Sequence, residues 1–288
     1  MQIKIIPSIF MLLISSFAFA QEATEIYLFD LIESGKSFTI KNPINISKQT
    51  GYDNQPSFTE DGSSILFTSF RDGQSDIAIY DIENDLRNWL TNTPVNEFSP
   101  MAYPGKKKLF TCIRSDKEEN QKLYIYAYKG KEPEVLIGDA KIAYYTWFDK
   151  NTLITYELGD MDALYVHNFK LKIKYPVQQN AGRSFLRKPG TVLLGFISEL
   201  HEEPEVYSMD LKTSKLNYLA DALENSLDMA FTTNGNILMA KDNQIYKLRP
   251  EEDKEWKNVP IESELPLKQI TRLAISPDGK KIAVVVAE

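Results

Sequence analysis

Short runs of alternating apolar and polar residues recur along the chain at a nearly constant interval. Each run opens with an aliphatic residue, and most place a tyrosine next, as in Ile26-Tyr27-Leu28-Phe29 and Leu123-Tyr124-Ile125-Tyr126. The runs are rich in β-branched and aromatic residues and are bounded by polar ones, which is typical of β-strands. The six runs begin at Ile26, Ile77, Leu123, Leu164, Val206 and Ile245.

Tight-turn residues form a second periodic marker, which falls between these runs. Asp-Gly and Asn-Gly pairs permit the positive φ angles that hairpin turns require. An apolar run follows each turn, and a fourth strand usually closes the unit, such as Arg87 to Leu90 or Lys215 to Tyr218. Each unit therefore predicts four strands. The turn pairs are Asp61-Gly62, Pro104-Gly105, Lys150-Asn151, Pro189-Gly190, Asn234-Gly235 and Asp278-Gly279.

A four-stranded unit that repeats about every 40 to 45 residues is typical of a β-propeller blade. Six such units fill residues 21–288. The sequence therefore predicts an all-β protein, a six-bladed β-propeller of four-stranded antiparallel blades, in one domain. No long helical pattern interrupts the repeat, and the acidic stretch Glu251 to Trp256 is predicted as a loop.

The two ends of the chain each hold half of a blade. Residues 273–288 carry only the first two strands of a unit. The N-terminal segment carries only the last two strands, at residues 25–31 and 44–48. We therefore expect the last blade to be closed by N- and C-terminal strands, because this joining removes two open sheet edges.

The first twenty residues have the pattern of a secretory signal peptide. Lys4 supplies a positive charge, residues 5–19 are nearly all apolar, and Ala18 and Ala20 form a small-x-small cleavage site before Gln21. An uncleaved membrane anchor is the alternative, but the apolar run is shorter than the roughly 20 residues that span a bilayer. The sequence thus predicts residues 1–20 as a cleaved signal peptide, and a periplasmic or secreted protein without stable membrane insertion.

Composition narrows the range of partners. The chain has 33 Lys and Arg against 40 Asp and Glu, a net charge of -7, and so lacks the clustered positive charge that nucleic-acid binding requires. Cys112 is the single cysteine of the sequence, so neither an internal disulfide nor a Cys-rich zinc site can form. We expect a monomer without a cofactor.

Two copies of the repeat carry the most specific motif. Residues 53–91 read DNQPSFTEDGSSILFTSFRDGQSDIAIYDIENDLRNWLT, and residues 276–280 read SPDGK. These residues resemble the repeats of the TolB-like six-bladed propellers, which are related to the WD-type repeats of other propellers. The resemblance covers residues 21–288 as an architecture and about half of them as a motif, since the three middle units are degenerate.

The resemblance implies a protein- or peptide-binding role in the cell envelope. TolB proteins carry an additional N-terminal domain that binds partners. Here the first strand pattern begins at Glu25, so we expect the propeller without that domain. Within the motif, Asp61-Gly62 is expected to make a hairpin turn. Two alternatives stay open for Arg71, namely an ion pair with a carboxylate such as Asp76 and a surface position that contributes little energy.

Propellers bind ligands at one mouth of the central channel, in the loops between strands. The connections that enter the innermost strands should line this mouth. Their mixture of charged and aromatic residues suits a protein or peptide better than a phosphate. The candidates for partner binding are Asp53, Glu97, Phe98, Tyr144, Tyr145, Arg183, Asp228 and Arg272.

The sequence offers weak signals for catalysis. His167 takes the place of a strand aromatic, and His201 lies in a charged loop. The chain has no Gly-x-Ser-x-Gly nucleophile motif, no Gly-rich phosphate loop and no His pair with zinc spacing. We therefore predict a non-catalytic protein, with no catalytic residues and no metal ligands.

Two other functions remain open. One is a calcium-assisted lactonase or sugar hydrolase that uses the carboxylates of Asp53, Glu97 and Asp228 in the channel. The other is carbohydrate binding, with Tyr144, Tyr145 or Trp147 as a stacking surface, although Trp147 occupies an inner-strand position that favours the core.

Overall fold

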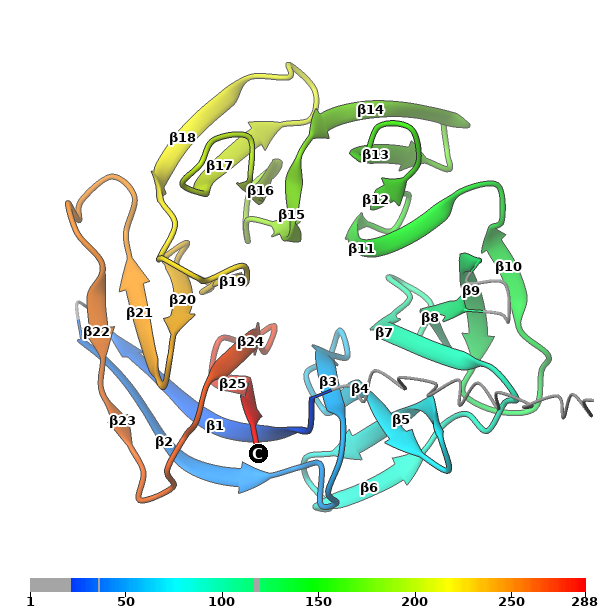
Figure 1. The fold of residues 1–288 in the computed structure, drawn as a ribbon, viewed down its shortest axis with the longest axis horizontal. Helices are drawn as coiled ribbons and strands as arrows, with labels where there is room; N and C mark the ends of the chain where they lie inside the picture. The colour runs from blue at the N-terminus through cyan, green and yellow to red at the C-terminus, as the bar shows by residue number, and fades with distance from the viewer. Residues whose placement is uncertain (1–21, 36, 116–119) are drawn as a thin grey trace, which may run out of the picture.

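The computed structural model describes residues 22–35, 37–115 and 120–288, which form strands, turns and loops. The predicted signal peptide lies outside these residues. Six sheets stand around a central axis like the blades of a propeller (Figure 1). The predicted six-bladed all-β fold is therefore confirmed. Within the described ranges, the chain has no helix with the length and apolar character needed to cross a membrane.

Blades 1 to 5 are each built from four consecutive antiparallel strands, and the first strand of each lies nearest the axis (Figure 1). Blade 1 consists of β3 (Asp53–Phe58), β4 (Ser64–Arg71), β5 (Gln74–Asp81) and β6 (Leu86–Trp89). Blade 2 consists of β7 (Asn96–Ala102), β8 (Leu109–Ser115), β9 (Gln121–Ala127) and β10 (Glu134–Ile137). Blade 3 consists of β11 (Lys141–Asp149), β12 (Thr152–Leu158), β13 (Ala163–Asn168) and β14 (Ile173–Gln179). Blade 4 consists of β15 (Ala181–Arg187), β16 (Leu193–Ser198), β17 (Glu205–Asp210) and β18 (Leu216–Asp221). Blade 5 consists of β19 (Met229–Phe231), β20 (Ile237–Lys241), β21 (Gln244–Leu248) and β22 (Lys257–Val259).

Blade 6 joins the two ends of the described chain. Ile26 lies opposite Val285 in an antiparallel pairing of β1 with β25, so the predicted closure by N- and C-terminal strands is confirmed. A short fifth strand, which the repeat did not predict, pairs parallel with β2 at the outer edge. From the axis outward the strands are β24 (Ile270–Ile275), β25 (Lys281–Ala287), β1 (Thr24–Ser34), β2 (Ser37–Asn45) and β23 (Ile261–Glu262).

The position predicted for the last N-terminal strand was wrong. The sequence pattern placed it at residues 44–48, whereas β2 spans Ser37–Asn45. The chain reverses directly after β1, at Gly35 with a φ of 58°, and Ser34 lies opposite Ser37. Strand β2 therefore forms one half of a tight hairpin with β1, and its alternating Phe38 and Ile40 side chains are buried.

The innermost hairpins turn where the sequence predicts. Gly62 has a φ of 72°, and its N–H donates to the carbonyl oxygen of Thr59 at 2.9 Å. Gly279 repeats this arrangement with Ser276, at a φ of 72° and 2.9 Å. A residue with a Cβ atom is strained in this backbone conformation, which explains the glycines. In blade 3 the turn position is Asn151, whose N–H is held instead by the carboxylate of Asp149 at 2.8 Å.

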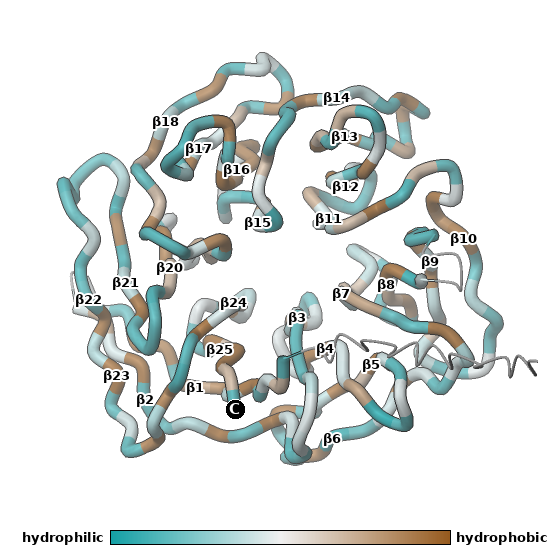
Figure 2. The backbone as a smooth tube through the Cα atoms, viewed as in Figure 1, coloured by the Kyte–Doolittle hydropathy of each residue, from teal (hydrophilic) through white to brown (hydrophobic). Residues whose placement is uncertain are grey.

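Six hydrophobic clusters hold the ring together, one between each pair of neighbouring blades. Between blades 6 and 1, for example, Ile26 and Leu28 of β1 pack with Ile65 and Phe67 of β4. Because each blade contributes one face to each of two clusters, the hydrophobic core is distributed around the ring. Polar residues gather in connections such as the largely hydrophilic one between β21 and β22 (Figure 2).

Candidate functional site

The innermost strands are irregular where they face the channel. The pairing register shifts between Asn54 and Ser57 in β3, and between Phe98 and Met101 in β7. Gln55 and Ser99, inside these two shifts, have φ angles of 57° and 52°. Strands β11, β15 and β24 contain register shifts of the same kind. A bulge leaves a residue outside the ladder and redirects its side chain, so these irregularities aim side chains at the axis.

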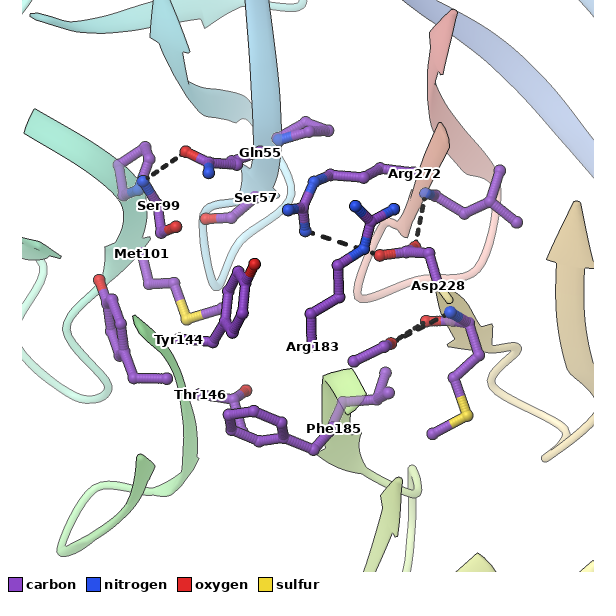
Figure 3. A pocket seen from close by; sticks show the side chains of 17 residues that line it. Gln55, Ser57, Ser99, Met101, Tyr144, Thr146, Arg183, Phe185, Asp228 and Arg272 are labelled. Atoms are coloured by element: carbon purple, nitrogen blue, oxygen red, sulfur yellow. Dashed lines mark hydrogen bonds and ion pairs between the residues drawn. The ribbon is translucent and has the colours of Figure 1, made fainter. Parts of the chain in front are cut away.

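One residue at the same place in each of the six repeats lines a cavity of about 140 Å³ in the channel (Figure 3). Successive members of this set lie 39 to 45 positions apart, which is the period of the repeat. All six are polar, and they supply two guanidinium groups, one carboxylate, one phenol, one amide and one hydroxyl. We call them the channel ring: Gln55, Ser99, Tyr144, Arg183, Asp228 and Arg272.

One carboxylate of the channel ring pairs with Arg272 and is influenced by the charge of Arg183. Arg272 Nη1 lies 3.7 Å from Asp228 Oδ2, an ion pair too long for a hydrogen bond. Asp228 Oδ1 accepts a hydrogen bond from the backbone N–H of Leu273 at 3.0 Å. Arg183 Nη2 donates to the carbonyl oxygen of Thr271 at 2.7 Å, while its Nε is buried without a partner. Within the described part of the chain, the Nε–H of Arg183 therefore lacks an acceptor, and the contact of Arg272 with Asp228 is too long for a hydrogen bond.

Burial disfavours the charged forms of Asp228 and Arg183. Desolvation raises the pKa of Asp228, and the cations of Arg272 and Arg183 partly oppose the rise. Desolvation also lowers the pKa of Arg183, and the neighbouring Arg272 lowers it further. The guanidinium of Arg272 lies 6.0 Å from the ring centroid of Tyr144. The site therefore holds two positive charges close together where water is partly excluded. This raises the free energy of the site, and a bound anion would lower it.

A second cavity adjoins the channel between blades 5 and 6. It has a volume of about 200 Å³ and shares Arg183, Asp228 and Arg272 with the channel. The side chains of Arg272 and Asp228 are 17% and 12% exposed. The charged part of the channel ring therefore lies where the two cavities meet.

Four of the predicted binding residues belong to the channel ring, namely Tyr144, Arg183, Asp228 and Arg272. The other four, which were also expected at the mouth, pack mainly within or between blades: Asp53, Glu97, Phe98 and Tyr145. Strand alternation separates Phe98 and Tyr145 from their neighbours in the channel ring, because adjacent residues on a strand point to opposite sides. Asp53 and Glu97 differ from Gln55 and Ser99 because the register shifts of β3 and β7 follow them.

Asp53 is wholly buried where blade 1 meets blade 6. Its carbonyl oxygen accepts a hydrogen bond from Thr24 Oγ1 at 2.8 Å, while both carboxylate oxygens lack a partner. Burial raises the pKa of Asp53 to about 6, against the opposing influence of Ser69 and Arg87. Asp53 is therefore a costly buried acid and is not presented to a ligand.

Glu97 is likewise engaged within blade 2 and with the loop before it, and Tyr145 in a contact between blades 2 and 3. Glu97 is wholly buried and accepts hydrogen bonds from the hydroxyls of Tyr126 and Thr93. Tyr145 borders the channel cavity, but its hydroxyl donates to the carbonyl oxygen of Thr111 at 2.7 Å. Phe98 packs against the hydrophobic cluster between blades 2 and 3.

Gln55 and Ser99 were not singled out from the sequence, yet both belong to the channel ring. Gln55 Oε1 accepts a hydrogen bond from the backbone N–H of Ser99 at 2.8 Å, and so links blades 1 and 2 at the channel (Figure 3). Extending the repeat period backward from Tyr144 would have found them. The predictions gave weight to charge and aromaticity instead.

The carboxylates proposed for a calcium site do not form one cluster. No group of three or more His, Cys, Asp or Glu side chains able to hold a metal ion occurs among the described residues. Asp53 and Glu97 are buried in packing contacts, and Asp228 faces two arginines. The three proposed carboxylates therefore do not converge on one metal ion in the described part of the chain.

His167 lies in a buried polar group within blade 3. Its Nε2 atom is 2.8 Å from Glu157 Oε1 and 2.9 Å from Thr155 Oγ1. Lys174 also contacts Glu157, at 2.7 Å. A hydrolase triad uses both imidazole nitrogens, one toward the nucleophilic hydroxyl and the other toward the carboxylate that orients the ring, whereas here Nε2 faces both groups. His201 is exposed and pairs with Glu205 at 2.6 Å.

The proposed stacking aromatics also lie apart. Tyr144 faces the channel, and Tyr145 is buried. Trp147 borders a different cavity, with Arg187, and its indole N–H donates to Thr111 Oγ1 at 3.0 Å. Trp147 also packs against Tyr103, with ring centroids 4.5 Å apart. No shared platform for a sugar ring follows from these three side chains.

Comparison with known proteins adds information on the fold. No protein-family model and no curated protein matches this chain. The TolB structure from Acinetobacter baumannii aligns with 93% of this chain at a TM-score of 0.61 and 12% identity, and this chain spans 64% of its length. The protein assigned as TolB from Agrobacterium tumefaciens aligns with 93% of this chain at a TM-score of 0.71 and 10% identity, and 99% of it is covered.

A luciferin-regenerating enzyme has a similar fold as well. It aligns with 82% of this chain at a TM-score of 0.59 and 12% identity, and 91% of that protein is covered. Identities this low establish the fold alone. They show that this chain has the fold of a six-bladed β-propeller, similar to that of the TolB structures.

Proposed function

We propose that this chain is an exported, non-catalytic propeller that binds a protein or peptide partner in the cell envelope. The observation that carries the proposal is the channel ring, which offers unused hydrogen-bond donors, a phenol and a carboxylate in an open cavity. Such a mixture recognises the polar backbone and side chains of a peptide. The expected signal peptide at residues 1–20 and the similarity in fold to TolB structures support the location.

The test is capture of a partner from envelope extracts by the immobilised protein. Tyr144→Ala and Arg272→Gln should each abolish capture of a partner that the unaltered protein retains. Arg187→Gln is the matched control, because Arg187 lies on β15 together with Arg183 but borders the cavity beside Trp147. Equal capture by all of these variants would refute binding at the channel ring. Substitutions of Asp53 or Glu97 would be uninformative, since both are wholly buried.

A calcium-assisted lactonase or sugar hydrolase is the second candidate. The similarity in fold to the luciferin-regenerating enzyme favours it, because that enzyme shows that a related ring can support catalysis. A metal that binds only the folded state raises the melting temperature. A rise on adding calcium that a chelator reverses would favour this candidate, whereas an unchanged melting temperature would favour the binding propeller.

A further inference from the structure

The two arginines of the channel ring have more donors than the protein uses. Among the described residues, Arg183 donates one hydrogen bond, to the carbonyl oxygen of Thr271, and its buried Nε–H has no partner. Arg272 contacts Asp228 only at 3.7 Å. A buried guanidinium donor without an acceptor costs free energy, and a charged oxygen acceptor removes that cost.

The charges at this place suit an anion with one negative charge. Arg183 and Arg272 carry two positive charges, and Asp228 carries one negative charge that is already held by the N–H of Leu273. The three side chains together therefore carry a single positive charge. A dianion would bring excess negative charge close to Asp228, whereas a monoanion balances the site. The planar fork of a guanidinium also matches the two oxygens of a carboxylate.

The site is accessible from two sides. Arg183, Asp228 and Arg272 line both the channel cavity and the adjoining cavity between blades 5 and 6. Figure 3 shows the guanidinium groups of Arg183 and Arg272 close together, with Tyr144 across the cavity. A group that entered from the channel would meet both arginines at once.

From these contacts we propose that Arg183 and Arg272 form a binding site for a carboxylate group of the ligand. The inference deepens the proposed function: in a peptide partner the carboxylate belongs either to an acidic side chain or to the chain terminus. Tyr144 would flank the bound group, and Asp228 would hold Arg272 in place.

The experiment uses the Arg Nε–H signals of the ¹⁵N-labelled protein. N-acetylglycine models a chain terminus, the α-amide of N-acetylglutamate models an acidic side chain, and N-acetylglycinamide is the uncharged control. We expect at least one carboxylate to shift the Arg183 signal in a saturable way, with a dissociation constant on the order of 1 mM, and the uncharged amide to leave it unchanged. Whichever carboxylate binds more tightly identifies the source.

Variants test whether Arg183 and Arg272 bind the carboxylate. Arg183→Gln, followed through the Arg272 signal, and Arg272→Gln, followed through the Arg183 signal, should weaken binding about tenfold or more. Arg187→Gln should leave it unchanged. The inference is overturned if the amide binds as well as the carboxylates, if inorganic phosphate binds more tightly than either, or if Arg187→Gln has the same effect as the channel variants.

This outcome is separable from that of the proposed function. Carboxylate binding without capture of any partner would leave the anion site standing and count against the binding propeller. Capture of a partner by both the unaltered protein and Arg183→Gln, without carboxylate binding, would refute the site and leave the binding function.

Discussion

Ile26 of β1 lies directly opposite Val285 of β25, so residues close to the two ends of the sequence share one sheet. Both side chains are fully buried in the cluster between blades 6 and 1. The pairing turns an open row of blades into a closed ring. The stability of every other blade is therefore linked to this contact.

Truncation at this contact should destabilise the ring as a whole. We expect Ile26→Ala to lower the free energy of unfolding by about 2 to 5 kcal/mol, because it removes buried methyl groups from a packed site. Ile32→Ala, on the same strand but 41% exposed, should change it by less than about 0.5 kcal/mol. Urea denaturation followed by tryptophan fluorescence measures both. Equal effects of the two variants would contradict closure as the source of stability.

Asp53 should make stability depend on pH. Its pKa of about 6 in the folded state lies above the ordinary 3.8. The stabilising contribution of Asp53 to the free energy of unfolding is therefore complete below pH 4 and is lost as the pH rises through 6. We expect Asp53→Asn to stabilise the protein at pH 7.5 by about 2 to 3 kcal/mol and to have little effect at pH 4. Urea denaturation at the two pH values provides the measurement.

Asp61 is the contrasting control for this pH dependence. Hydrogen bonds from Thr59 and Ser63 lower its pKa to about 2, so its contribution is present above pH 4 and is lost as the pH falls toward 2. Asp61→Asn should therefore lower the melting temperature at pH 7.5, where Asp53→Asn raises it. If both variants changed the melting temperature in the same direction at pH 7.5, the result would contradict the environments described for Asp53 and Asp61.

Gly195 on β16 allows blade 5 to approach blade 4 closely. A Cβ atom at this position would overlap the ring of Phe231 on β19. We expect Gly195→Ala to destabilise the protein by about 1 to 3 kcal/mol, as overpacking of a core does. Gly159→Ala is the matched control, since no atom lies within 4 Å of the added Cβ. Thermal unfolding compares the two, and a stable Gly195→Ala protein would show that the blades can shift apart.

Arg71 and Asp76 form an ion pair, which was one of the two alternatives that the sequence left open. Arg71 Nε lies 2.9 Å from Asp76 Oδ2, and the Asp76 side chain is only 1% exposed. The guanidinium also lies 3.9 Å from the ring centroid of Trp89. Arg71→Met should therefore cost about 3 kcal/mol, because it leaves a buried carboxylate with fewer partners.

The control for Arg71 is an exposed pair of the same kind. Lys131 and Glu134 lie 2.5 Å apart, and their side chains are 64% and 63% exposed. Lys131→Met should change the free energy of unfolding by less than about 1 kcal/mol, since water screens such a pair. If urea denaturation found the two substitutions equivalent, the Arg71 pair would have no special role.

The architecture could be predicted from the sequence because a blade is a local unit. Alternating runs such as Leu164 to Asn168 and turn pairs such as Asp278-Gly279 specify strands and hairpins through short-range sterics and side-chain alternation. The repeat of these signals then determined the number of blades, and the half-units at the two ends determined the composite blade. The β2 strand was misplaced because its hairpin turns at Gly35 without the expected Asp-Gly or Asn-Gly pair.

The residues of the site could not be predicted from the sequence alone, because neighbouring residues of one type have different surroundings in the folded protein. Tyr144 and Tyr145 are neighbours of one chemical type, yet the first lines the channel and the second donates a hydrogen bond to Thr111 of another blade. Local bulges decide which side chains leave the ladder, and packing against the next blade decides which are buried. The sequence by itself determined the ring and its closure. Only the tertiary structure brought Arg183, Asp228 and Arg272 from three blades to one place, because their contacts exist only once the ring has closed.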